Sequence, residues 1–314
     1  MQHQALWFRR FGPPAQVLEL EAGELGPRPP GRVRVRMRLG PVNPSDLVPI
    51  TGAYSHRVQP PLVAGYEGLG VVTEADAADA RLLGRRVLPL RGQGTWQTEL
   101  DCDPAWLVPV PEAIDDGLAC RAYINPLAAL RMLRRWPVRG RRVLLTAGGS
   151  TCAALLAQWA LADGAAEVVA IHRAPGHEAG LRALGASTLS IGDLEAVAAA
   201  AARAEVIFEA VGGGLAELIL SHAPAAADFV SYGLLSGAAF RTPPTGPRPQ
   251  RFHLRDELSG IAPETWQGWF AELWPRLAAS RLPPLEPFAL GRWREALELF
   301  QRSGRTAKPA LLLS

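Results

Sequence analysis

A buried strand, a turn of small residues and an apolar helix follow one another near the middle of the chain. Val143 to Leu145 is a short aliphatic run, the small-residue turn covers Ala147 to Ser150, and a second aliphatic run, Val168 to Ile171, comes after the helix. Such runs are typical of strands buried in a parallel sheet. The first N–H groups of a helix lack partners within it, and the helix dipole favours an anion there. The stretch therefore predicts a βαβ unit whose turn can hold the pyrophosphate of a dinucleotide.

The glycine pattern of dinucleotide-binding turns is met only in part. Thr151 stands where a glycine is usual, and Ala153 replaces the last glycine, a variant that helix packing allows. On this turn alone, a dinucleotide site and an ordinary βαβ unit with a tight turn are supported about equally. The remainder of the chain has to decide between them.

Composition narrows the class of protein. A chain of 314 residues with 48% hydrophobic and 20% charged residues predicts two globular domains. Basic and acidic residues nearly cancel at a formal charge of +3, so nucleic acid is not an expected partner. No apolar run approaches the ~20 residues that cross a bilayer, and Met1 to Leu20 carries charges in place of a signal-peptide core, so we expect a cytoplasmic protein without a membrane partner. Three scattered cysteines (Cys102, Cys120 and Cys152) indicate buried thiols rather than disulfides.

The local patterns divide the chain into a β part and an α/β part. Val33 to Leu39 alternates apolar residues with Arg34, Arg36 and Arg38, which predicts a half-exposed strand with its arginines in water. An irregular segment, Gly40 to Gly65, is where such a scaffold would place a loop-borne site. From about Asp115 helices and short strands alternate, which predicts a doubly wound parallel sheet with strands at 188–191, 205–211, 228–232 and 258–261. The α/β fold class follows.

A set of short motifs resembles the medium-chain dehydrogenase/reductase superfamily along nearly the whole chain. In order, they are Asn43-Pro44-Ser45-Asp46, Gly52-Ala53-Tyr54, Glu67-Gly68, Gly94-Thr95-Trp96-Gln97-Thr98-Glu99, Asn125-Pro126, Leu184-Gly185-Ala186 and Tyr232-Gly233. The first two and the Gly-Thr-Trp motif are similar to the zinc-free 2-enoyl thioester reductases more than to the quinone oxidoreductases.

The resemblance implies a fold, a cofactor and an activity. It implies a GroES-like catalytic domain (1–118 with 275–314), a Rossmann domain (119–274), NADPH in the cleft between them, and a homodimer. It also implies reduction of the activated double bond of a 2-enoyl thioester. An NADPH:quinone oxidoreductase and a catalytically idle cofactor-binding homologue are the alternatives, and the incomplete glycine pattern keeps the idle one open.

The resemblance also assigns roles to residues. It makes Tyr54 the catalytic residue, with Asn43 and Trp96 near the substrate, although buried structural roles suit both of these equally well. The implied cofactor-binding residues are Asn125, Gly148, Gly149, Ser150, Thr151, Cys152, His172, Arg173, Ala174, Tyr232, Gly233, Leu234, Leu235, Ile261 and Lys308. Zinc members of the superfamily use cysteine and histidine at the places of Asn43-Pro44-Ser45-Asp46 and Gly65-Tyr66-Glu67, so no metal is expected.

Four side chains have a chemical reason for these roles. Hydride arriving at the β-carbon pushes charge onto the thioester carbonyl oxygen, and the Tyr54 phenol can stabilise that enolate and assist protonation; a loop tyrosine packed on the β domain is the structural alternative. His172-Arg173, in place of an acidic residue, predicts recognition of the 2′-phosphate of NADPH. Lys308 is the one lysine among 33 basic residues, which indicates a place that needs a compact ammonium group.

Overall fold

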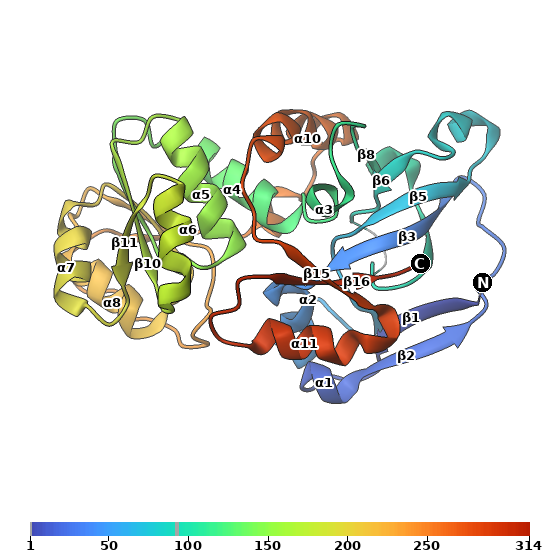
Figure 1. The fold of residues 1–314 in the computed structure, drawn as a ribbon, viewed down its shortest axis with the longest axis horizontal. Helices are drawn as coiled ribbons and strands as arrows, with labels where there is room; N and C mark the ends of the chain where they lie inside the picture. The colour runs from blue at the N-terminus through green and yellow to red at the C-terminus, as the bar shows by residue number, and fades with distance from the viewer. Residues whose placement is uncertain (1, 92–93) are drawn as a thin grey trace. The chain divides into compact units, whose positions relative to one another are not determined.

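The computed structural model describes residues 2–91 and 94–314, and these form two compact units (Figure 1). The first unit contains Met1–Ile124, Ile261–Ala278 and Pro284–Ser314, and the second contains Asn125–Gly260 and Ala279–Pro283. Residues 119–124 and 261–274, which the resemblance places in the Rossmann domain, therefore pack with the first unit.

The first unit is built on two β-sheets. The larger has the order β15-β16-β3-β5-β6-β8, with β7 also paired to β3. Its strands are β3 (Val33–Pro41), β5 (Leu69–Glu74), β6 (Arg86–Leu88), β7 (Glu99–Cys102), β8 (Val108–Pro109), β15 (Leu285–Ala289) and β16 (Lys308–Leu312). The smaller sheet has the order β2-β1-β4, formed by β1 (His3–Phe8), β2 (Leu18–Gly23) and β4 (Leu62–Val63). Because β16 lies between β15 and β3, chain segments about 270 residues apart share one sheet.

Short helices connect and cover these strands. They are α1 (Pro14–Val17), α2 (Pro44–Leu47), η1 (Val48–Thr51), η2 (Ala77–Leu82), η3 (Pro104–Trp106), α3 (Asp116–Ala119), α10 (Pro263–Ala278), η5 (Leu290–Arg292) and α11 (Trp293–Gln301). In α11 the buried positions Trp293, Ala296 and Leu297 recur at helical spacing, so one face of the helix covers the core.

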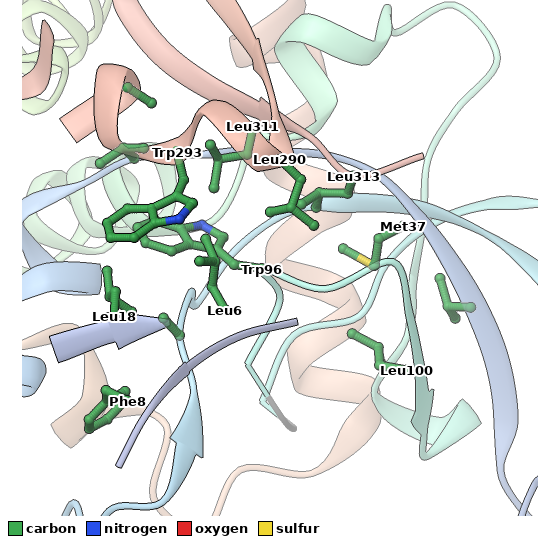
Figure 2. Close-up of a cluster of buried hydrophobic side chains, with 14 of the residues drawn as sticks. Leu6, Phe8, Leu18, Met37, Trp96, Leu100, Leu290, Trp293, Leu311 and Leu313 are labelled. Atoms are coloured by element: carbon green, nitrogen blue, oxygen red, sulfur yellow. The ribbon is translucent and has the colours of Figure 1, made fainter. Parts of the chain in front are cut away.

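The core of the first unit joins residues from both ends of the chain. Figure 2 shows Trp96 and Trp293 beside Leu6 and Leu311, and all four side chains are buried. Truncating a buried tryptophan of this kind costs about 3 to 5 kcal/mol. The packing therefore ties the C-terminal segment firmly to the N-terminal strands.

One expectation for β3 is wrong. Arg36 and Arg38 are exposed as predicted, but Arg34 is only 8% exposed. The reason is that β7 pairs with β3 and places Asp101 opposite Arg34, whose Nε lies 2.9 Å from the Asp101 carboxylate. A partner strand distant in sequence thus buries an arginine that the alternation alone puts in water.

The second unit is a parallel sheet with the order β11-β10-β9-β12-β13-β14. Its strands are β9 (Arg142–Leu145), β10 (Glu167–His172), β11 (Ser187–Ser190), β12 (Val206–Glu209), β13 (Asp228–Ser231) and β14 (Pro249–Arg251). The connecting helices are α4 (Ile124–Arg135), α5 (Thr151–Ala162), η4 (Pro175–His177), α6 (Glu178–Ala183), α7 (Leu194–Arg203), α8 (Gly213–His222) and α9 (Leu254–Glu257). In chain order this is 3-2-1-4-5-6, the doubly wound Rossmann arrangement.

The strand expected at 258–261 is wrong. The sixth strand is β14, at Pro249–Arg251, and it pairs in parallel with β13. Gly260 instead has a φ of 72°, and Pro263 begins α10. A short strand at the edge of a sheet, containing proline and polar residues, carries no apolar signal that a sequence pattern could detect.

In the described part of the chain, no helix combines the length and apolarity that crossing a bilayer requires.

Candidate functional site

The turn after β9 has the geometry of an anion site. Ser150 is the N-cap of α5, and its hydroxyl accepts a hydrogen bond from the Ala153 N–H at 3.2 Å. Ala147 adopts a φ of 53°, which non-glycine residues rarely do, and the Gly148 N–H donates to the Ile171 carbonyl at 2.7 Å. The chain thereby turns sharply into a 12-residue helix whose first N–H groups need partners.

Gly149 at this turn is covered by an imidazole that sequence reasoning did not single out. A Cβ added at Gly149 would lie 2.5 to 2.8 Å from ring atoms of His177, which belongs to η4 after β10. Only glycine allows the imidazole to approach this closely. His177 therefore stands beside the turn after β9, and the sole sequence signal was its place a few residues beyond Arg173.

The end of β10 carries the residues expected to read a 2′-phosphate. His172 is the last residue of the strand and is 5% exposed, while Arg173 is exposed and Ala174 is half-buried. Among the described residues, no carboxylate pairs with the Arg173 guanidinium. This edge of the sheet therefore offers a positive charge without a carboxylate partner in the described structure.

A buried carboxyl group lies where the strand order reverses, between β9 and β12. Glu209 ends β12, and its Oε1 accepts from the Val211 N–H at 2.6 Å, the Gly212 N–H at 2.9 Å and the Thr146 hydroxyl at 3.3 Å. Burial raises the pKa of Glu209. Ligands of such sheets bind at this reversal. No local sequence signal marks Glu209, because it ends an apolar run that predicts only a buried strand.

The segment after β13 follows the end of β12 closely. The Tyr232 N–H donates to the Glu209 carbonyl at 2.8 Å, and the Leu235 N–H donates to the Ala210 carbonyl at 2.9 Å. A Cβ on Gly233 would lie 2.9 Å from the Ala210 oxygen, so glycine is needed for this approach. Leu234 and Leu235 are exposed.

Asn125 lies beside the start of α5. The Cys152 thiol, at the second position of α5, is 3.9 Å from the Asn125 carbonyl oxygen. Burial raises the pKa of Cys152 to about 12, so the thiol stays protonated and is no nucleophile. The expected cofactor residues Asn125, Gly148 to Cys152, His172 to Ala174 and Tyr232 to Leu235 thus gather at the carboxyl ends of the strands in the second unit.

Tyr54 lies in the first unit, on a turn that follows η1. Gly52 adopts a φ of 90°, and a Cβ there would lie 3.2 Å from the Phe11 ring. The Tyr54 carbonyl accepts from the Arg57 and Val58 N–H groups at 2.9 Å. The Tyr54 ring is half-buried, and the Arg57 guanidinium carbon lies 4.5 Å from its centre. The Tyr54 ring packs against the hydrophobic core of the first unit while staying partly exposed.

A buried polar network of the first unit is formed by Asn43, Asp46, Glu67 and Lys308. Asn43 and Asp46 belong to α2 and its N-cap, and α2 leads through η1 into this turn. The Lys308 ammonium donates to Asn43 Oδ1 at 2.5 Å, and Asn43 Nδ2 donates to Glu67 Oε1 at 2.7 Å and to Asp46 Oδ2 at 3.1 Å. Each of the four residues is at most 8% exposed. Burial lowers the pKa of Lys308 and raises that of Glu67, while their mutual attraction opposes both shifts.

Two further residues of the candidate site are placed in the first unit. Trp96 is 1% exposed and belongs to the core in Figure 2, with its indole N–H directed at the Pro41 carbonyl at 3.3 Å. This burial favours the structural role left open above over a wall of a substrate pocket. Ile261 is half-buried and precedes α10.

The sequence motif contained Asp46 and Glu67, but reasoning from residue types did not predict that they would be buried together. Asn43 finds its partners 24 and 265 residues away along the chain, and no local pattern encodes those distances. Within the ranges 2–91 and 94–314, no group of three or more His, Cys, Asp and Glu side chains is arranged to hold a metal ion.

The titration of Asp46 gives a testable pH dependence. Burial raises the pKa of Asp46 to about 7, from 3.8 for an unburied group. The folded protein therefore binds more protons than the unfolded chain between these values, and stability falls as pH rises through this window. We expect the free energy of unfolding to drop by roughly 2 kcal/mol between about pH 5.5 and 8 through this group. Denaturant unfolding should show a smaller drop in Asp46→Asn, and equal slopes in both proteins would contradict the assignment.

The comparisons with known proteins fit this architecture. Residues 29–112 match the alcohol dehydrogenase GroES-like domain. A Bacillus thuringiensis protein assigned as an NADPH:quinone reductase is 30% identical, with each chain covered to 99% and a TM-score of 0.91. The chain combines a GroES-like domain with a doubly wound sheet, and it aligns with this relative over nearly the full length of both proteins. These features define the class of protein. The chain belongs to the medium-chain dehydrogenase/reductase superfamily.

Within that superfamily, curated relatives include the mitochondrial enoyl-[acyl-carrier-protein] reductase of Xenopus tropicalis. It is 35% identical over 140 residues, which is 41% of this chain and 38% of that protein. The chain thus spans well under half the length of the curated relatives that it matches first. The Etr1p/Etr2p 2-enoyl thioester reductase heterodimer of Candida tropicalis is 17% identical with a TM-score of 0.84, covering 99% of this chain and all of that one, and shows a shared fold.

Proposed function

We propose that the protein is a zinc-independent, NADPH-dependent oxidoreductase that reduces the activated carbon–carbon double bond of a 2-enoyl thioester. The observation that carries this proposal is Tyr54, a half-buried phenol on a tightly hydrogen-bonded turn of the first unit. Hydride goes to the β-carbon, and the phenol O–H stabilises the enolate oxygen and assists delivery of a proton to the α-carbon. The match to enoyl reductases over 140 residues supports it.

NADPH would bind to the second unit, along the carboxyl ends of its strands. The N-terminus of α5 with Gly148 to Cys152 would take the pyrophosphate. His172, Arg173 and Ala174 would surround the 2′-phosphate, and we add His177 because its ring lies against Gly149. Asn125 and Tyr232 to Leu235 would line the remainder of the cofactor. NADPH supplies the hydride, and the protein's part is to bind and orient it.

Quinone reduction is the second candidate function. The Bacillus thuringiensis relative, aligned over almost the whole chain, carries that assignment. A quinone needs the same hydride donor but no dedicated proton donor. The two functions are separated by measuring NADPH oxidation with a crotonyl or longer 2-enoyl thioester and with a simple quinone. Turnover of the quinone alone would favour the second candidate, and NADPH binding without either activity would favour a catalytically idle protein.

Arg173 gives a test of cofactor choice. Its exposed guanidinium has no carboxylate partner in the described structure, and an arginine–phosphate hydrogen bond contributes about 1.5 to 3 kcal/mol. We expect Arg173→Ala to raise the KM for NADPH by about 10-fold or more and to leave that for NADH nearly unchanged. Arg203→Ala, which removes an exposed arginine from the end of α7, is the matched control. Equal effects of Arg173→Ala on both cofactors would show that Arg173 does not contact the 2′-phosphate.

We also propose that two copies form a homodimer in the cytoplasm. In the described structure, β14 is an edge strand of the sheet in the second unit. The backbone groups on its outer edge are therefore available for pairing with a second copy of the chain. Light scattering on the purified protein measures the number of copies.

A further inference from the structure

The hydrogen bonds of the buried polar network fix which atom of each side chain faces which neighbour. Lysine can only donate, so the oxygen of the Asn43 amide must face Lys308 and its nitrogen must face the carboxylates. Glu67 Oε2 in turn accepts from the Tyr123 N–H at 3.2 Å and the Ile124 N–H at 2.8 Å. The network has one consistent arrangement of donors and acceptors, because flipping the amide would set donor against donor.

One arm of the network is connected to Tyr54 through consecutive hydrogen-bonded turns. Asn43 is the N-cap of α2, and Asp46 returns a hydrogen bond by accepting from the Asn43 N–H at 2.7 Å. The hydrogen-bonded residues of η1 follow directly on α2, and the Gly52 N–H donates to the Pro49 carbonyl at 3.2 Å. The Ser55 N–H then donates to the Gly52 carbonyl at 3.0 Å. A displacement of Asn43 would therefore be passed on to the phenol.

The other arm ends at the last residues of the N-terminal segment of the first unit. Both N–H groups that Glu67 accepts from belong to Tyr123 and Ile124, and Asn125 follows directly in the chain. The Thr95 hydroxyl donates to the Glu67 carbonyl at 2.8 Å and holds the residue from its backbone side. Glu67 is thus fixed at both its carboxylate and its main chain, and it joins segments around positions 43, 95 and 123.

We propose that Glu67 is a positioning residue for the reaction, acting with Asn43 and Lys308. Its carboxylate holds the Asn43 amide, which sets the origin of the α2–η1–Tyr54 segment, and at the same time holds the backbone from which Asn125 follows. This inference rests on the proposed function for its catalytic meaning. A misplacement of about 1 Å in such a group can cost about 100-fold in rate even when the altered residue is away from the chemistry.

The Glu67→Gln variant tests this with almost no change of shape. Each orientation of the new amide sets its NH₂ group against a donor, either Asn43 Nδ2 or the Tyr123 and Ile124 N–H groups. At a temperature where the variant is fully folded, we expect kcat with a 2-enoyl thioester to fall by about 10-fold to 100-fold. The KM for NADPH should change much less, because the cofactor-binding residues of the second unit are intact.

A double variant supplies the rescue. In the double variant Glu67→Gln with Asn43→Asp, the negative charge moves to position 43. The new carboxylate accepts hydrogen bonds from Lys308 and from the NH₂ group introduced at position 67. The amide oxygen at position 67 accepts from the Tyr123 and Ile124 N–H groups. Asp46, with its pKa already raised to about 7, can hold a proton and donate it to the new carboxylate. We expect kcat to recover to within a few-fold of the parent's. Glu74→Gln, a change of the same kind at an exposed carboxylate that pairs with Arg34, is the control.

The outcomes are distinguishable from failure of the proposed function. An unchanged kcat in Glu67→Gln, or a folded double variant as slow as the single one, would overturn the inference. If the parent itself turns over no acceptor, the proposed function fails. The positioning role is then judged by amide hydrogen exchange of residues 44–58. Faster exchange in Glu67→Gln with recovery in the double variant supports the positioning role, and unchanged exchange overturns it. If Glu67→Gln does not fold, Thr95→Val is measured in its place, because it keeps the side-chain volume and loses one hydrogen bond to Glu67. A lower kcat in Thr95→Val supports the inference, and an unchanged kcat overturns it.

Discussion

Tyr54→Phe should lower kcat for a 2-enoyl thioester by about 100-fold or more while leaving KM comparatively unchanged. The substitution removes one hydrogen-bond donor and preserves the ring, which packs under Arg57 with 4.5 Å between the guanidinium carbon and the ring centre. A donor that stabilises the enolate acts mainly in the transition state, so its loss appears in kcat.

The measurement pairs two acceptors in the parent and the variant. A quinone accepts hydride readily and gathers charge on its own oxygens, so its reduction should be far less sensitive to Tyr54→Phe. Tyr66→Phe, which removes a hydroxyl from a different half-buried tyrosine of the first unit, is a matched control. Equal small losses on both acceptors would remove Tyr54 from the mechanism and favour quinone reduction as the function.

Lys308→Met should lower the free energy of unfolding by about 3 to 5 kcal/mol. The variant retains the volume of the stem but deletes the ammonium that donates to Asn43, and it leaves the Asp46 and Glu67 carboxyl groups buried without it. Arg302→Met removes the same charge from an exposed position and should cost less than about 0.5 kcal/mol. Denaturant unfolding of the three proteins provides the comparison.

Lys308→Arg separates charge from shape at the same position. The chain uses arginine for every other basic residue, yet the place beside Asn43 is 8% exposed and holds a compact ammonium. A planar guanidinium is wider, and overpacking a buried site costs about 1 to 3 kcal/mol. We therefore expect Lys308→Arg to be destabilised and to bind NADPH more weakly. NADPH binding as tight as that of the parent protein would contradict the need for an ammonium.

The sequence predicts those parts of the fold that are encoded locally. The strand expected at 205–211 contains β12 (Val206–Glu209), and the strand expected over Val143 to Leu145 lies within β9. Both segments have strong apolar patterning and clear turns at their ends. β14 lacks such a pattern because an edge strand of proline and polar residues is held by backbone pairing with β13. Arg34 is buried for a similar reason, since its partner Asp101 arrives from a different strand.

The site divides in the same way. Ser150 as the N-cap and the cationic end of β10 are readable from a few adjacent residues. The contact between His177 and Gly149 depends on how the loop after β10 returns to the turn after β9, and the two residues lie 28 positions apart along the chain. The network around Asn43 depends on still longer closures, so residue types alone could place its members in a motif but not in contact.

The position of β16 inside the larger sheet has a consequence for how the chain folds as it leaves the ribosome. β16 pairs with both β15 and β3, so the first sheet stays incomplete until residues 308–312 have been synthesised. The second unit, formed almost entirely by Asn125–Gly260, has all its strands available much earlier. Domains generally fold as units during synthesis. The part of the chain made first should therefore finish folding last, and the buried carboxyl groups near Asn43 must wait for their counter-charge until translation reaches Lys308.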